Sequence, residues 1–440
     1  MYILFVLIAV IILMVLATTK FHLHPFLSLL IAGIIMGFVG GLSEFEVTNT
    51  LMDGFGKTLG SVGIIIAFGT IIGAYLEKSG GAKTLANWVL KIIGENRSVL
   101  AMNVTGFIVS IPVYCDSGFI ILSSLNRAIS KKAKIPLVVL GVSLAAGLYA
   151  THVLVPPTPG PLAATAALDA DLGLVIALGL VVAIPVSLTG FFWAKNIGKN
   201  IKYKMPKNFV NDTKIEKLPI PSLSFAPILV PIILIALKSV SNYPTHPFGD
   251  GVFFGVINFI GNPIIALLVG VFLSFKLKDN KAKETHLNWV TSGLKEAGII
   301  ILITGAGGAF GAILRATGIG EIIGSSLSTF NLGLFLPFLI AAVLKSAQGS
   351  STVSIITTAA IIAPLLEPFG LDSSMGRALS VLSIGLGAMT VSHVNDSFFW
   401  VVAQFTKMNT ATALKSHTVS SLFQGITGLS LIILINWLFA

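Results

Sequence analysis

GTIIGAYLEKSG at residues 69–80 and GGAFGAILRATG at residues 307–318 are two copies of one pattern in this chain. Each copy ends an apolar run and carries three glycines and a leucine at the same four places. The matched pairs, 238 residues apart, are Gly69 with Gly307, Gly73 with Gly311, Leu76 with Leu314 and Gly80 with Gly318. The pattern predicts an internal duplication, which is a recurring feature of membrane transporters.

The same features follow both copies in the same order. After a short amphipathic stretch comes an apolar run interrupted by polar residues, by PVYCDSG within 99–125 and by KSAQGSS within 332–366. The legs of these runs have about 12 to 18 residues, and several are too short to cross a hydrocarbon core of about 30 Å. We therefore expect two re-entrant hairpins, each with its tip at membrane depth inside the protein.

The composition indicates a polytopic membrane protein. Of the 440 residues 55% are hydrophobic and only 10% are charged, whereas soluble domains carry roughly 25% charged residues. The run at 3–19 lacks the basic start of a secretory signal and is expected to be the first span. We expect ten spans, at 3–19, 25–41, 59–76, 135–168, 172–194, 223–240, 253–275, 297–314, 377–407 and 419–439.

The net charge of +10 is explained by the loops. If the first span runs from outside to inside, most of the 28 lysines and arginines lie in loops on one side, which is then cytoplasmic. The two glycine patterns then run in opposite directions, and both termini are outside. The expected fold is all-α, with two inverted-topology repeats, each of about five transmembrane helices plus one re-entrant hairpin, and broken helices at the midplane. The repeats cover 1–194 and 223–440, joined by a basic cytoplasmic linker at 195–222.

Two polar segments of the first half are candidates for chemistry. In PVYCDSGF (112–119), Pro112 and Gly118 bracket a turn, and Asp116 and Ser117 begin a returning helix, whose free N–H groups favour an anion. Asp116 is a candidate proton carrier, and the alternative is a helix cap. In THVLVPPTPGP (151–161), four prolines break a span. His152 there carries a proton or binds a substrate hydroxyl, and the alternative is an interhelical hydrogen-bonding group.

Two segments of the second half are their counterparts. KSAQGSST (345–352) places polar side chains around the flexible Gly349. Lys345 either neutralises a carboxylate or snorkels to the outside, and snorkelling is the favoured interpretation. SHVNDS (392–397) places His393 and Asp396 within a span, where ionisable groups are costly unless they pair or function.

Several other functions are excluded or disfavoured. No glycine-lysine phosphate loop and no His/Cys metal spacing occur, so neither a nucleotide, a metal nor another cofactor is expected. Cys115 is the single cysteine, so no intrachain disulfide forms. An intramembrane enzyme that uses His393 and Asp396, and a passive channel, stay open as alternatives, but no nucleophile–base set is evident. No nucleic-acid partner is expected.

Taken together, the motifs resemble the gluconate:proton symporter (gluconate permease) family of the wider ion-transporter superfamily. The resemblance covers nearly the whole length and includes 60–82, PVYCDSGF, THVLVPPTPGP, GAGGAFGAIL (305–314), QGSSTV (348–353) and SHVNDSFFW (392–400). It implies proton-coupled uptake of gluconate or a similar hydroxy acid across a bacterial cytoplasmic membrane, by alternating access. Family members also carry idonate-like sugar acids, glycerate and D-serine, and the superfamily implies a homodimer in the lipid bilayer.

We therefore expect the two hairpin tips and two broken helices to meet and bind a small anionic sugar acid or hydroxy acid. The candidate substrate-binding residues are Ser117, Gly118, Thr151, Thr158, Gln348, Gly349, Ser350, Ser351, Thr352 and Asn395. The coupling site is drawn from Asp116, His152, His393 and Asp396. Sodium is the alternative coupling ion, because hydroxyls and free carbonyls at broken helices also bind it.

Overall fold

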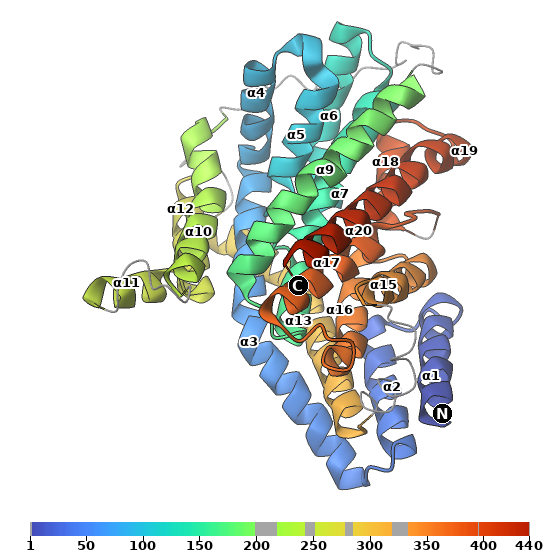
Figure 1. Cartoon of the computed structure of the whole chain (residues 1–440). Helices are drawn as coiled ribbons and strands as arrows, with labels where there is room; N and C mark the ends of the chain where they lie inside the picture. The colour runs from blue at the N-terminus through green and yellow to red at the C-terminus, as the bar shows by residue number, and fades with distance from the viewer. Residues whose placement is uncertain are drawn as a thin grey trace.

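The computed structural model describes residues 2–198, 218–242, 251–277, 285–318, 333–394 and 396–439. In these ranges the secondary structure is entirely helical (Figure 1). The first half contains α1 (Tyr2–Thr19), α2 (Pro25–Val39), α3 (Glu44–Lys78), α4 (Gly81–Ile93), α5 (Ser98–Val109), α6 (Cys115–Ala133), α7 (Leu137–Leu154), α8 (Pro159–Ala167) and α9 (Leu172–Gly198). The second half contains α10 (Pro221–Ser241), α11 (Val252–Ile260), α12 (Pro263–Phe275), α13 (His286–Ala316), α15 (Phe335–Gln348), α16 (Ser351–Ile362), α17 (Ser374–Met389), α18 (Ser397–Phe405), α19 (Thr410–Ala413) and α20 (Val419–Phe439).

Six of the described helical segments are long and apolar enough to cross a membrane, or seven if α11 and α12 form one bent span. The all-α, multi-pass class is therefore confirmed. Three of the ten expected spans are not single straight helices, since the run at 135–168 divides into α7 and α8. The run at 377–407 divides into α17 and α18, and the run at 253–275 bends by 63° between α11 and α12. The break between α11 and α12 was not predicted. Its cause is local, because Asn262 caps α12 and Pro263 begins it.

The two glycine patterns end the long helices α3 and α13, which cross one another closely. A Cβ on Gly54 would lie 2.8 Å from the carbonyl oxygen of Gly308, and a Cβ on Gly308 would lie 1.9 Å from Thr58 Oγ1. Only hydrogen fits at these two positions, so glycine sets the distance between the helices. Both helices begin well before their predicted apolar runs, because polar residues such as those at 44–58 continue the helix.

Helix interruptions occur at all four predicted segments. The pairs α5–α6 and α15–α16 each turn at a polar tip, and α7–α8 and α17–α18 are separated at 155–158 and 390–396. A leg of 12 residues, such as α5 or α16, spans only about 18 Å, less than a bilayer core. The depth of the tips in a membrane stays a prediction.

The described helices follow one order in both halves, with a long helix, a hairpin, a broken helix and a further long helix. The last of these, α9 and α20, pack against each other. There Thr189 Oγ1 lies 3.2 Å from Thr427 Oγ1, and these residues are separated by the same 238 positions as the glycine patterns. A contact between equivalent positions is what a two-fold relation of the halves would produce. It supports the inverted repeat and the predicted domain division, which both stay predictions.

Candidate functional site

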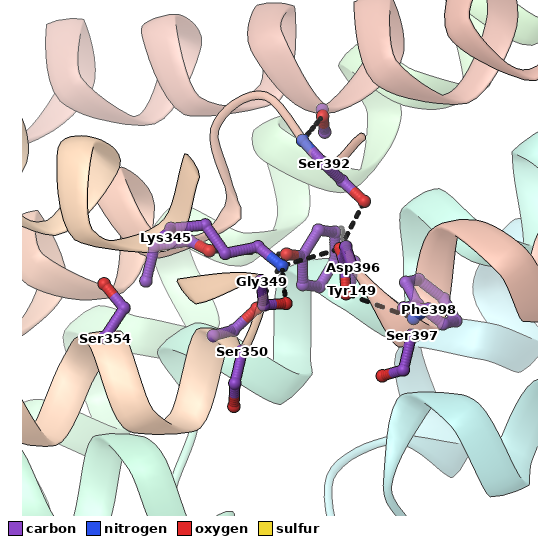
Figure 2. A network of polar contacts seen from close by, with 12 residues as sticks. Tyr149, Lys345, Gly349, Ser350, Ser354, Ser392, Asp396, Ser397 and Phe398 are labelled. Atoms are coloured by element: carbon purple, nitrogen blue, oxygen red, sulfur yellow. Dashed lines mark hydrogen bonds and ion pairs between the residues drawn. The ribbon is translucent and has the colours of Figure 1, made fainter. Parts of the chain in front are cut away.

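Three helix N-termini lie close together where the hairpin tips meet the broken helices. Ser397 Oγ, at the start of α18, donates to Asp116 Oδ2 in the first turn of α6 at 3.1 Å. Tyr149 of α7 and Ser351 of α16 share a hydrogen bond of 2.7 Å between their hydroxyls. The α15–α16 tip is tied to α18 by an ion pair between Lys345 and Asp396 (Figure 2). The structure thus brings residues from three of the four predicted segments into one region, together with Tyr149, which lies just before the fourth at 151–161.

Lys345 and Asp396 form a fully buried ion pair at the centre of this region. Lys345 Nζ lies 2.6 Å from Asp396 Oδ2, and the two side chains are 1% and 4% exposed. The same Nζ donates to the carbonyl oxygen of Gly349 at 2.7 Å. Gly349 adopts φ +79°, a left-handed conformation that suits glycine and ends α15. The expectation that Lys345 snorkels to the outside is wrong, because two oxygen acceptors hold its ammonium inside the protein.

Asp396 has further partners that fix its carboxylate. It caps α18, since Oδ1 accepts from the N–H of Phe398 at 3.1 Å. Ser392 Oγ donates to Oδ2, and the same hydroxyl lies 3.2 Å from Nε2 of the buried His417. The His417 ring stands 5.4 Å from the Phe398 ring, edge to face. Asp396 is therefore held by a continuous network from Lys345 to His417.

Asp116, by contrast, is held loosely. Its Oδ2 accepts from Ser397, while its Oδ1 is buried without a hydrogen-bond partner among the described residues. Ser117 beside it is half-buried. Gly118 is buried against α7, where a Cβ would lie 2.8 Å from Leu148 Cδ2, so its role is close packing. The first hairpin tip thus offers a carboxylate oxygen that is free for a proton or a ligand.

The α7–α8 break is uncharged apart from His152. The His152 ring is buried, and its Nδ1 has no hydrogen-bond partner in the described part of the chain. Tyr114, whose ring centroid is 5.9 Å from that of His152, likewise has a buried, unpartnered hydroxyl. Thr158 donates to the Val155 carbonyl at 2.7 Å, and Thr151 donates within its own helix to a carbonyl 3.4 Å away. A small hollow of about 10 Å³ beside this break is lined by Tyr114, Thr158 and neighbouring prolines.

The second hairpin tip presents most of the remaining candidates. Ser350 caps α16 by accepting from the N–H of Val353 at 3.3 Å, and Thr352 beside it is half-buried. The Oε1 atom of Gln348 is buried without a hydrogen-bond partner in the ranges described. His393 is partly exposed, and its carbonyl accepts from the N–H of Asp396 at 2.9 Å. Asn395 lies outside the described residues.

Three members of the network were not predicted from the sequence, namely Tyr149, Ser392 and His417. Each is a polar residue in an otherwise apolar helix or at its break, and such a residue needs a partner in a membrane. Tyr149 and His417 lie outside the four motifs, and Ser392, although it begins SHVNDS (392–397), is not among the predicted site residues. His417 lies in the short π-helical stretch Leu414–Thr418, and π-bulges are frequent at functional sites.

The helix N-termini of the region favour a bound anion, while its charged side chains are one lysine and two aspartates, Lys345, Asp396 and Asp116. The N-termini of α6, α16 and α18 meet in this region, where Ser350 and Asp396 each cap one N–H group. Helix N-termini carry a partial positive charge. Lys345 adds a full positive charge, which Asp396 neutralises in this structure. Within the described residues, no group of three or more His, Cys, Asp or Glu side chains could hold a metal ion.

A multi-pass helical fold with polar, broken helices that enclose a charged site defines a membrane transporter. The chain belongs to the GntP permease family, because the sequence model described as GntP family permease matches residues 1–438. The protein is therefore a permease and not an enzyme.

Relatives with known names cover nearly the whole chain. It is 33% identical to the gluconate permease of Pseudomonas aeruginosa, over 95% of this chain and 94% of the relative. It is 31% identical to the D-serine transporter DsdX of Escherichia coli, over 96% and 95%. The crystal structure of the YdaH transporter of Alcanivorax borkumensis matches with a TM-score of 0.59 at 15% identity, covering 90% of each chain. That last likeness shows a shared fold.

Proposed function

We propose that this permease is a secondary active transporter for proton-coupled uptake of gluconate, or a related small hydroxy-carboxylate, across the bacterial cytoplasmic membrane. The observation that carries the proposal is the meeting of three helix N-termini beside the buried Lys345. Transporters of several folds bind anionic substrates at the N-termini of broken helices. The gluconate permease of Pseudomonas aeruginosa, similar over almost its whole length, supports the same substrate class.

Hydroxyl groups surround the positive charge, which suits a polyhydroxy acid. Ser350, Ser351, Thr352 and Ser117 are half-buried, and Ser397 is exposed. Hydroxyls both donate and accept hydrogen bonds, so they can pair with the hydroxyls of a sugar acid in either sense. Gln348 adds an acceptor that lacks a partner within the described part of the structure.

Proton coupling is supported by two carboxylates at the site. Asp116 has one free buried oxygen, and Asp396 is enclosed by the ion-pair network. Carboxylates within membrane segments are characteristic of proton relays. A proton that enters with a monoanion moves no net charge, so a proton gradient can drive accumulation without opposition from the membrane potential.

The alternative is a sodium-coupled symporter, or a carrier for a D-serine-like amino acid. The similarity to DsdX, a D-serine transporter, favours this second substrate class. Serine hydroxyls and the free carbonyls of the breaks are also typical sodium ligands. A homodimer, implied by the superfamily resemblance, is part of the proposal for either substrate.

Uptake of labelled gluconate into proteoliposomes tests the proposal. An inward proton gradient is compared with an inward sodium gradient of equal size, with protein-free liposomes as the control. Accumulation above the equilibrium level under the proton gradient alone is the expected result. Accumulation driven by the sodium gradient would show that sodium, and not the proton, is the coupling ion. If gluconate is not taken up under either gradient but glycerate or D-serine is, that compound and not gluconate is the substrate.

A further inference from the structure

We propose that Lys345 and Asp396 form a charge-exchange site, in which the substrate carboxylate replaces Asp396 as the partner of Lys345 and Asp396 takes the coupled proton. This inference rests on the proposed function and deepens it, since it names the residue that binds the anion and the residue that carries the proton. Among the Lys, Arg, Asp and Glu residues that the structure describes, only Lys345 and Asp396 are buried.

The geometry leaves Lys345 able to accept a new partner. Its ammonium has three N–H donors, of which the Gly349 carbonyl and Asp396 Oδ2 occupy two. The Gly349 bond stays within the α15–α16 tip and can persist during exchange. In Figure 2 the Lys345 ammonium lies between Gly349 and Asp396, with Ser350 beside Gly349 and Ser397 on the far side of Asp396. Ser350 is half-buried and Ser397 is exposed, so the proposed approach of the ligand to the buried pair is from their side.

Charge neutrality then couples the anion to a proton. The pair is neutral as it stands, and a monoanion that enters alone would leave one uncompensated negative charge in a buried site. Such a charge is strongly disfavoured. A proton taken from the outside water by a carboxylate oxygen of Asp396 restores neutrality, and it leaves to the cytoplasmic water when the substrate does. Ser392 is placed to rotate its hydroxyl and accept a hydrogen bond from the protonated acid.

Other titratable groups surround Asp396, but none shares its position. Lys345 faces it from α15, Tyr149 from α7, and His417 through Ser392. Asp116 approaches from α6 through Ser397, and His152 and Cys115 lie within electrostatic range. Asp396 alone among the described carboxylates contacts Lys345 directly, so its charge must change when the ammonium takes another anion.

Proton uptake on gluconate binding tests the inference without requiring transport. Isothermal titration calorimetry of the purified full-length protein, in two buffers of different ionisation enthalpy at one pH, counts the protons bound per gluconate. We expect about one proton for the wild type and none for Asp396→Asn, whose side chain imitates the protonated acid. The apparent Kd of the wild type should rise about tenfold per pH unit while Asp396 is ionised, and this dependence should vanish in the variant.

Two further variants keep the test independent of folding. The double variant Lys345→Met, Asp396→Asn removes both buried charges together and should weaken gluconate binding by about 100-fold. Asp169→Asn removes the exposed carboxylate that lies 3.8 Å from Arg377 and should behave as the wild type.

The other outcomes distinguish failure of the charge-exchange site from failure of the proposed transport function. If Asp396→Asn still binds one proton with gluconate, or the double variant binds as tightly as the wild type, the charge exchange is overturned and the transporter proposal stands. If the wild type binds gluconate without a proton, the exchange is likewise overturned. If the wild type binds neither gluconate, glycerate nor D-serine, the proposed function fails, and the inference fails with it.

Discussion

The two hairpin tips share a backbone design and differ in their chemistry. Each tip joins two helices beside a broken one, in α5–α6 with α7–α8 and in α15–α16 with α17–α18. The first tip and break are uncharged except for Asp116 and His152, and both keep buried atoms without a partner among the described residues. The second tip and break are joined by a buried ion pair in a connected network. The duplication thus supplies the frame, and the second half supplies the charge that is exchanged.

The largest expected effect concerns the ion pair. Lys345→Met leaves Asp396 buried without its cation and should lower the free energy of unfolding by about 3–5 kcal/mol, with loss of gluconate uptake. The double variant with Asp396→Asn should recover most of the stability but not the uptake. Thermal unfolding in detergent and proteoliposome uptake measure both. Equal stability of the single and double variants would show that the pair is not buried as described.

The next effect compares how tightly the two hairpins pack, by substituting the equivalent glycines Gly73 and Gly311. A Cβ on Gly73 would lie 2.6 Å from the Pro112 carbonyl oxygen at the first tip, whereas one on Gly311 would lie 3.3 Å from that of Ala360. Gly73→Ala must shift backbone and should cost about 1–3 kcal/mol, with a lower uptake rate. Gly311→Ala should cost less on both measures. If the two variants lose stability equally, the close packing of the first tip against α3 is refuted.

Asp116→Asn tests how far the first tip takes part in coupling. The asparagine oxygen can still accept from Ser397, so we expect gluconate uptake to remain proton-driven and to slow by less than about tenfold. Uptake rates under an imposed proton gradient measure this. Loss of proton-driven accumulation, with gluconate exchange retained, would move the proton site from the second half to the first.

The smallest effect concerns a helix cap. Ser350→Ala removes the side-chain cap of α16 and should cost about 1 kcal/mol. Ser373 caps α17 in the same way, through the N–H of Gly376 at 3.0 Å, and Ser373→Ala is the matched control. Both variants should lose similar stability in thermal unfolding, but only Ser350→Ala should weaken gluconate binding. Equal binding by the two would place Ser350 outside the substrate site.

Much of this architecture could be predicted from the sequence, because apolar runs, prolines and polar interruptions act locally. Proline cannot continue a helix, so the break before Pro159 follows directly from the sequence. The partner of Lys345 could not be found in this way. It lies in a different segment, and only the tertiary fold decides whether a lysine near a tip turns outward or inward. The positions of Tyr149 and His417 depend on the same packing of distant helices.

The response of gluconate uptake to membrane potential tests the central claim most directly. A monoanion that crosses together with one proton moves no net charge, so uptake should not depend on the potential. A potassium diffusion potential, negative inside, is imposed on proteoliposomes at equal pH on both sides, and initial gluconate uptake is measured. The account predicts no change for the wild type. In Asp396→Asn each gluconate would carry one uncompensated negative charge against about 2.3 kcal/mol per 100 mV, and uptake should slow. Faster wild-type uptake under this potential, or an Asp396→Asn variant that ignores it, would contradict the account.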